Sequence, residues 1–139
     1  MIQAIDHIGI AVRDLDASMQ LYRTIFGVSD FHQEVVADQG VAIASFMING
    51  VRLELTAPLH DDTPIGKFLA SRGEGIHHVA FRTDAINSDL QRLQDAGIRL
   101  INERPQPGAH DMRIAFLHPK STGSVLMELC APANDVSHP

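Results

Sequence analysis

The 139-residue chain is poor in cysteine, in basic residues and in long apolar runs, and each shortage excludes a class of protein. Its single cysteine, Cys130, excludes an internal disulfide and fits a reducing compartment. Eleven Lys and Arg residues against 17 Asp and Glu give a net charge of −6, which argues against a nucleic-acid or anionic-membrane partner. No apolar run approaches the roughly 20 residues that span a bilayer, and the N-terminus lacks a signal-peptide pattern. We therefore expect a cytoplasmic protein.

What is present is typical of a globular domain. Hydrophobic residues make up 45% of the chain and charged residues 20%, which excludes disordered, collagen-like and coiled-coil proteins. A chain of this length can bury a core without disulfides or metals as staples. We therefore expect a single domain over residues 1–139, with two half-size repeats as a further possibility.

The first half predicts one strand, one helix and three more strands. An apolar, β-branched segment over 5–12 indicates a strand, and the helical spacing over 15–26 indicates a helix with Asp14 as its N-cap and Gly27 after its end. Strands are predicted over 31–36, 41–48 and 51–56. Asn49-Gly50 predicts a tight hairpin turn between the last two, because a type I′ turn needs positive φ at both central positions.

The second half repeats this order after a short amphipathic helix over 64–72. A strand is predicted over 76–82, followed by a helix that starts after the possible cap Asp84, carries apolar residues from Ile86, and ends at Gly97. Further strands are predicted over 98–102, 113–117 and 124–130, with a loop over 104–108. Residues from 131 onward are expected to form a frayed tail.

Equivalent residues recur in the two halves. His7 in the first strand of one half corresponds to His78, 71 positions later, and Glu54 in the last strand corresponds to Glu128, 74 positions later. An insertion of three residues accounts for the difference. A period near 70 residues indicates two copies of one βαβββ unit, at about 4–58 and 75–130.

Strand alternation places the two glutamates away from the helices. The alternating neighbours of Glu54 and Glu128 are apolar and should pack on the helices, so both carboxylates should face the inside of a curved sheet. A buried carboxylate is costly unless a cation or donor meets it. We therefore predict that His7, Glu54, His78 and Glu128 converge on one divalent metal ion. Each could also be an ordinary strand residue, but their joint recurrence favours the metal site.

The other histidines have weaker claims. His77 adjoins His78 but corresponds to Asp6, which places it on the helix-packing side of its strand, in a structural or supporting role. The remaining histidines have no counterpart in the other half and are expected in loops or on the surface. They are His32, His60, His110, His118 and His138.

Several segments resemble the vicinal oxygen chelate superfamily and, within it, the methylmalonyl-CoA epimerase family. The resemblance covers residues 4–130 and is carried by five segments. They are Ile-Asp-His-Ile-Gly-Ile-Ala-Val at 5–12, Asp-Gln-Gly-Val at 38–41, Gly-Ile-His-His-Val-Ala at 75–80, Phe-Leu-His-Pro-Lys at 116–120 and Val-Leu-Met-Glu-Leu at 125–129. The resemblance implies an α+β fold, in which two tandem βαβββ repeats form a cupped mixed sheet around a metal site.

The resemblance also implies a reaction. It assigns His7, Glu54, His78 and Glu128 as metal ligands and Glu128 as a proton-transfer base. The ion (Co, Ni, Mn, Fe or Zn) would leave two positions open for a substrate. The implied activity inverts C2 of an acyl-CoA thioester, methylmalonyl-CoA, through a metal-stabilised enolate. Relatives carry a second catalytic glutamate where this chain has Ile43, and some carry glutamine in place of Glu54. We therefore assign Glu54 as the second catalytic residue, with a metal-bound water as the alternative.

Other functions share parts of this pattern. Glyoxalase I uses the same metal quartet on a glutathione hemithioacetal, an extradiol dioxygenase needs only two histidines and one carboxylate, and binding proteins of the superfamily need no metal. We expect a homodimer. Candidate CoA contacts are Lys67, Arg72, Arg104 and Lys120, together with the backbone N–H groups of residues 120–123 as donors to the substrate carboxylate.

Overall fold

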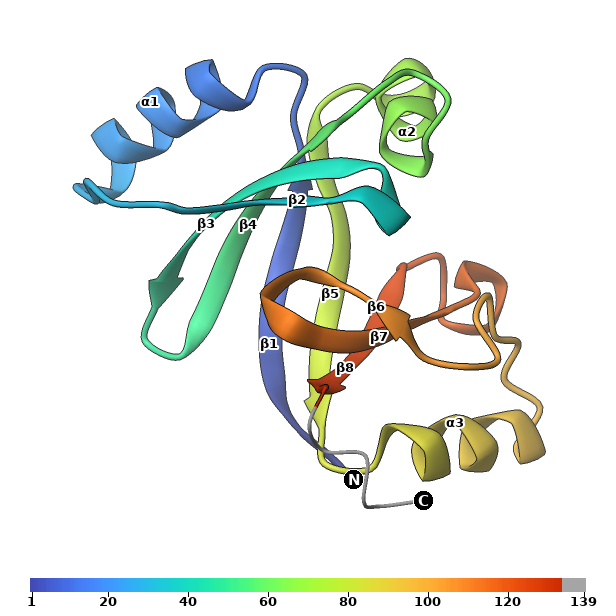
Figure 1. Ribbon diagram of the computed structural model, residues 1–139. Coiled ribbons are helices and arrows are strands. Elements are labelled where there is room, and N and C mark those ends of the chain that lie inside the picture. Colours follow the sequence, from blue (N-terminus) through green and yellow to red (C-terminus); the bar gives the residue numbers. More distant parts are fainter. Residues whose placement is uncertain (134–139) are drawn as a thin grey trace. The chain divides into compact units, whose positions relative to one another are not determined.

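The computed structural model describes residues 1–133, which form a mixed α+β fold (Figure 1). Contacts between Cα atoms divide it into two compact units. The first unit is His7–His77, and the second unit is Met1–Asp6 together with the chain from His78 onward. The predicted tail lies outside the described residues from position 134, while its first residues belong to the last strand.

The first unit is built from the predicted helices and strands with shifted ends, and the second unit departs from the prediction at one strand. The strands that begin the two repeats are β1 (Ile2–Ala11) and β5 (Gly75–Thr83). The helices are α1 (Leu15–Phe26), α2 (Pro64–Arg72) and α3 (Ile86–Asp95). The remaining strands are β2 (His32–Val36), β3 (Val41–Ile48), β4 (Val51–Pro58), β6 (Gln106–Pro107), β7 (Met112–Leu117) and β8 (Met127–Pro132).

The strand order confirms the duplicated βαβββ unit. The strands are ordered β2-β3-β4-β1 in the first repeat and β6-β7-β8-β5 in the second. In each repeat the last three strands pair antiparallel, and the last strand pairs parallel with the first. Glu54 lies opposite Gly9 and Ser45, and Glu128 lies opposite Ala80 and Phe116. The two repeats therefore agree even in register.

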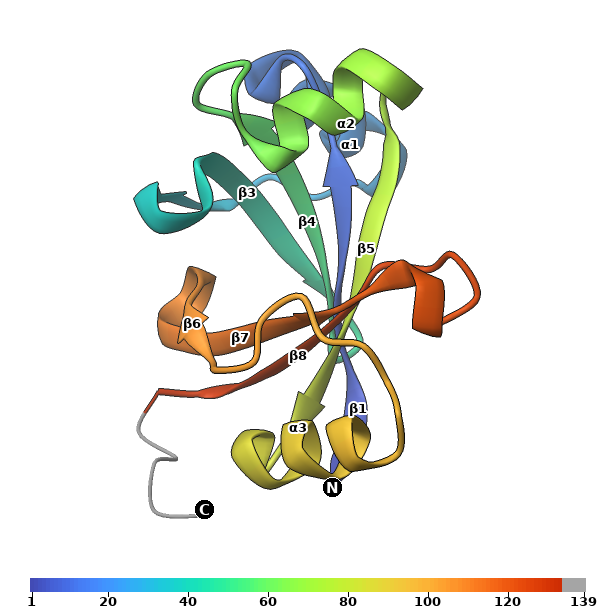
Figure 2. The ribbon, with the colours of Figure 1, turned by 90° about the vertical axis from the view of Figure 1, so that its right-hand side faces the viewer.

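Each unit packs one sheet face on a helix. In the first unit, Met19 of α1 contacts a buried cluster that includes Ala44 and Leu55. In the second unit, Leu90 of α3 contacts Leu129, and Figure 2 shows α3 along one side of β7 and β8. The helix-facing side thus takes the apolar residues next to each glutamate, as predicted, and the glutamates take the other side.

Local signals in the first repeat are confirmed. The Asp14 side chain accepts a hydrogen bond of 3.0 Å from the Ala17 backbone N–H and caps α1. Gly27 ends the helix with a φ of 67°. Asn49 and Gly50 have φ values of 43° and 87°, so both central turn positions are left-handed, as a type I′ hairpin requires.

Three local predictions for the second repeat are wrong. The N-cap residue of α3 is Ala85 and not Asp84. The Asp84 carboxylate instead accepts a hydrogen bond of 2.7 Å from the Met1 ammonium group. Residues 98–102 contain a single β-bridge, at Leu100, because the Asn102 side chain takes the Phe116 N–H that a strand backbone would take. The strand expected over 98–102 is instead the short strand β6, which lies inside the segment 104–108 that was predicted as a loop.

The last strand also begins later than predicted. Ser124 has a φ of 72°, a left-handed backbone that a strand does not contain, and β8 starts at Met127. Within residues 1–133, no helix combines the length and apolar character that crossing a bilayer requires.

Candidate metal and substrate site

Each repeat brings one histidine next to one glutamate. In the first unit, His7 Nε2 lies 3.7 Å from Glu54 Oε1, with side chains 6% and 4% exposed. In the second unit, His78 Nε2 lies 3.7 Å from Glu128 Oε1, with side chains 7% and 4% exposed. The same pair of groups at the same spacing, buried in both units, is the main feature of the site.

The donor groups of both pairs fit a divalent metal ion. A separation of 3.7 Å is long for a hydrogen bond. It is close to the roughly 3–3.5 Å between two ligand atoms that each bind one ion at about 2.1 Å. Imidazole nitrogen with carboxylate oxygen suits the first-row divalent metals. Burial of both side chains also makes a cation the natural partner for each carboxylate.

The surroundings of the two pairs differ. Glu54 shares its sheet face with Ser45, directly opposite on β3, and with Thr56 on its own strand. Glu128 lies opposite Phe116, whose ring meets His78 edge-on with the ring centroids 5.6 Å apart. The first unit therefore places two hydroxyl residues on the face that carries its pair, and the second unit places an aromatic ring beside its pair.

Ile43 lies on the same sheet face as Glu54. It is paired with Thr56 across the β3–β4 ladder and is only 4% exposed. Since Ser45 and Ile43 are two residues apart on one strand, both side chains point to the sheet face that carries Glu54. A glutamate at position 43 would therefore lie on the same sheet face as Glu54, whereas the isoleucine found there has no proton to exchange.

Arg52 is the site residue that the sequence analysis missed. Its Nε lies 3.3 Å from Glu54 Oε2, its Nη2 lies 3.3 Å from His7 Nδ1, and its side chain is 12% exposed. The signal was available, because Arg52 precedes Glu54 by two residues and alternation places both on one face.

His77 lies outside the pairs, as predicted. Its ring meets Phe68 of α2 edge-on at a centroid distance of 5.0 Å. Burial, and after it the nearby Arg72 charge, lower the pKa of His77 from 6.5 to about 4. The imidazole is therefore neutral over most of the physiological range and acts as a packing residue of the first unit.

Three of the backbone N–H groups over 120–123 that were expected to face a substrate carboxylate are bonded within their own turn. The Lys120 N–H donates to His118 Nδ1 (3.1 Å), the Ser121 N–H to the His118 carbonyl (2.9 Å) and the Thr122 N–H to the Pro119 carbonyl (3.2 Å). These three donors are used within the turn, so they are not available to a substrate carboxylate. The four candidate CoA contacts are all exposed; they are Lys67, Arg72, Arg104 and Lys120. Lys67 Nζ lies 3.5 Å from Asp62 Oδ1.

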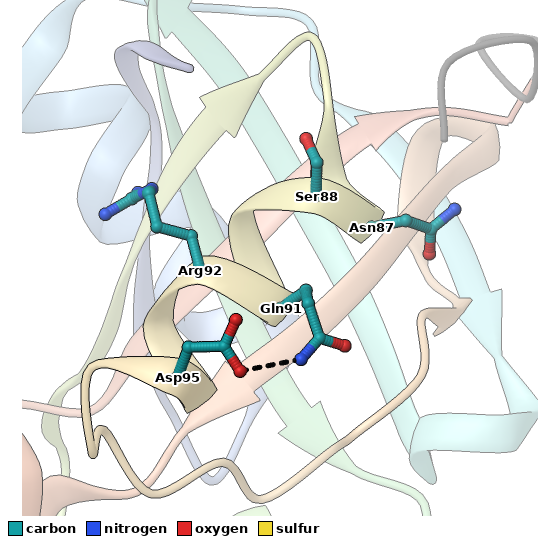
Figure 3. A pocket seen from close by; sticks show the side chains of 5 residues that line it. All are labelled: Asn87, Ser88, Gln91, Arg92 and Asp95. Carbon is teal, nitrogen blue, oxygen red and sulfur yellow. Dashed lines mark hydrogen bonds between the residues drawn. The ribbon is translucent and has the colours of Figure 1, made fainter.

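A shallow hollow lies on the exposed face of α3. It is lined by exposed residues of one helix face: Asn87, Ser88, Gln91, Arg92 and Asp95 (Figure 3). Within it, the Gln91 amide donates a hydrogen bond of 2.9 Å to the Asp95 carboxylate. Polar residues at helical spacing on a solvated face explain this surface, and we assign it no ligand.

Comparison with known proteins gives a consistent set of relatives. Residues 6–116 match the sequence model of the Glyoxalase/Bleomycin resistance protein/Dioxygenase superfamily. The uncharacterized protein YqjC of Bacillus subtilis (strain 168) is 41% identical over 131 residues, 94% of either chain. The mitochondrial methylmalonyl-CoA epimerase of Homo sapiens is 34% identical over 90% of this chain and 72% of its own. A solved variant of the Streptomyces coelicolor methylmalonyl-CoA epimerase, in complex with 2-nitronate-propionyl-CoA, is 42% identical with a TM-score of 0.92 over 96% of both chains.

Proposed function

Because the chain belongs to the Glyoxalase/Bleomycin resistance protein/Dioxygenase superfamily, we propose that it is a metal-dependent epimerase that inverts C2 of methylmalonyl-CoA. Its similarity to epimerases over nearly its whole length assigns it to the racemases and epimerases. The observation that carries the metal-dependent mechanism is the buried His–Glu pair that both repeats hold at the same register and the same 3.7 Å spacing.

The two pairs are proposed to hold one ion together. His7 and Glu54 from the first repeat, with His78 and Glu128 from the second, make a ligand set of two imidazoles and two carboxylates. The ion, when bound, supplies Lewis-acid catalysis and lowers the cost of the negative charge on the deprotonated substrate. The candidate metals remain Co, Ni, Mn, Fe and Zn, since this donor set suits each of them.

The two carboxylates are proposed to move the proton. The Glu128 carboxylate takes the proton from C2, and the electron pair of the broken C–H bond moves into the thioester carbonyl. Glu54, which has taken up a proton from solvent beforehand, then donates that proton to the opposite face of C2 and inverts the centre. After the product leaves, Glu128 releases its proton to solvent, and Glu54 takes up a new one. Glu128 is only 3% exposed and lies opposite Phe116, and this burial limits the exchange of its proton with water during the step.

Deuterium exchange tests this function. The purified full chain, loaded with a divalent metal, is incubated with methylmalonyl-CoA in D₂O, and the label at C2 is followed by NMR. We expect label to enter with metal and to stop after a chelator. Label that enters equally with and without metal would refute metal dependence. No label, combined with turnover of a glutathione hemithioacetal, would favour the glyoxalase I alternative.

Glu54→Gln tests the second base. The amide keeps the shape and one oxygen ligand but cannot exchange a proton, so the variant should retain bound metal and lose at least about 100-fold in turnover. Glu103→Gln, at an exposed position, is the matched control. An epimerisation rate in Glu54→Gln equal to that of the control would remove Glu54 from the mechanism and favour a water molecule as the second acid.

A further inference from the structure

Arg52 contacts two of the proposed metal ligands at once. Its guanidinium group reaches Glu54 through Nε and His7 through Nη2, each over 3.3 Å, and its side chain is largely buried. The register explains this, because Arg52 lies opposite His7 in the β1–β4 ladder and shares a face with Glu54. Both ligands of the first unit thus have a permanent cation beside them.

The second repeat carries leucine, not arginine, at the corresponding position. The residue two positions before Glu128 is Leu126, and the partner directly across the ladder from Glu128 is Phe116. The His–Glu spacing is nevertheless 3.7 Å in both units. Arg52 is therefore not needed to set that spacing, and its presence beside one pair calls for a different role.

The contact with His7 is incompatible with metal binding. An arginine can only donate hydrogen bonds, so His7 Nδ1 must accept, and the single proton of a neutral imidazole then lies on Nε2. A histidine that binds a metal has a free lone pair on the ligating nitrogen and a proton on the other. Whichever ring nitrogen of His7 holds the ion, Arg52 has to leave its present position.

We infer that Arg52 is a resident cation that competes with the divalent metal ion for His7 and Glu54 and thereby sets the metal affinity of the site. The inference rests on the metal site of the proposed function. Without the ion, the guanidinium group compensates the buried Glu54 carboxylate. When the ion binds, it takes over that charge compensation, and Arg52 gives up its hydrogen bond to His7.

Metal titration tests this role. The full chain is stripped with a chelator, dialysed, and titrated with Co²⁺ in a calorimeter, with the absorption spectrum of bound Co²⁺ as a second readout. Arg52→Leu introduces the residue type of the second repeat. Because it removes a charge that opposes the ion at close range, we expect it to bind Co²⁺ at least about tenfold more tightly than the wild type. Arg13→Leu, which removes the positive charge of an exposed arginine in the same unit, is the control and should leave the affinity unchanged.

Unchanged or weaker Co²⁺ binding by the variant would contradict this role of Arg52. If Arg52 instead held the ligands in place for the ion, Arg52→Leu would bind Co²⁺ more weakly, and equal or weaker binding overturns the inference. Arg52→Gln keeps a hydrogen-bond donor without the charge, so the same gain in affinity is expected from it if the leucine variant does not fold. Co²⁺ binding by the wild type without a gain in the variants overturns the inference alone. Failure of the wild type and every variant to bind Co²⁺ overturns the metal site as well.

Discussion

His77→Phe should make the protein less sensitive to acid. The imidazole of His77 packs edge-on against Phe68, and burial together with Arg72 lowers the pKa of His77 to about 4. A phenylalanine can keep the aromatic contact but takes up no proton. Above pH 6.5 the imidazole is neutral in both the folded and the unfolded chain, so it then adds no pH dependence.

The size of the effect follows from the two pKa values. Between pH 6.5 and about 4, the unfolded chain binds a proton at His77 and the folded chain does not, so stability falls as the pH falls. At pH 5 this linkage costs the wild type about 2 kcal/mol relative to pH 7.5. For a domain of this size, that corresponds to roughly 4–8 °C in melting temperature.

Thermal unfolding of metal-free protein at pH 7.5 and pH 5.0, followed by circular dichroism, measures this effect. A chelator is present at both pH values, so loss of metal does not contribute. The melting temperature of His77→Phe should fall several degrees less on acidification than that of the wild type. His60→Gln, which removes an exposed imidazole, is the control. Equal acid shifts in His77→Phe and the wild type would refute the reasoning.

Three further predictions concern the core, a helix cap and the second base. Leu129→Ala, at a site 1% exposed beside α3, should cost about 2–5 kcal/mol in urea denaturation, and a loss below 1 kcal/mol would contradict the core assignment. Asp14→Ala should cost about 1 kcal/mol in the same assay, since it removes the side-chain cap of α1; an unchanged midpoint would show that the cap contributes nothing. Ile43→Glu, placed in the Glu54→Gln background, should restore part of the deuterium exchange because it puts a carboxylate on the same face; no recovery in a folded double variant would argue against this geometry.

Pattern and turn chemistry predicted most of the first unit. The hairpin at Asn49 and Gly50, the cap at Asp14 and the burial of Glu54 follow from residue type and spacing alone, because each is decided within a few residues. The segment over 98–102 was mispredicted because a distant group decides it. The Asn102 side-chain oxygen accepts a hydrogen bond from the Phe116 backbone N–H, so residues 98–102 do not form a regular strand although their residue types favour one.

The candidate site was predictable in its repeated part and not in its unique part. The recurrence of one histidine and one glutamate at equivalent positions of both repeats identified four candidate ligands, because chance seldom produces such a recurrence. They are His7, Glu54, His78 and Glu128. Arg52 escaped that criterion because the other repeat has no arginine there. The backbone donors after His118 were overestimated for another reason: a sequence does not show which N–H groups a turn already uses.

The division of β1 between the two units has a consequence for any part of the chain produced alone. Residues 1–6 belong with the second repeat, where Met1 and Asp6 contact Asp84 and Arg82, while the strand continues into the first repeat from His7. The first unit is one continuous stretch of chain, whereas the second unit is completed by six residues that lie ahead of the first unit in the sequence. A fragment that began at His78 would lack those residues and the ion pairs that Met1 and Asp6 form with Asp84 and Arg82.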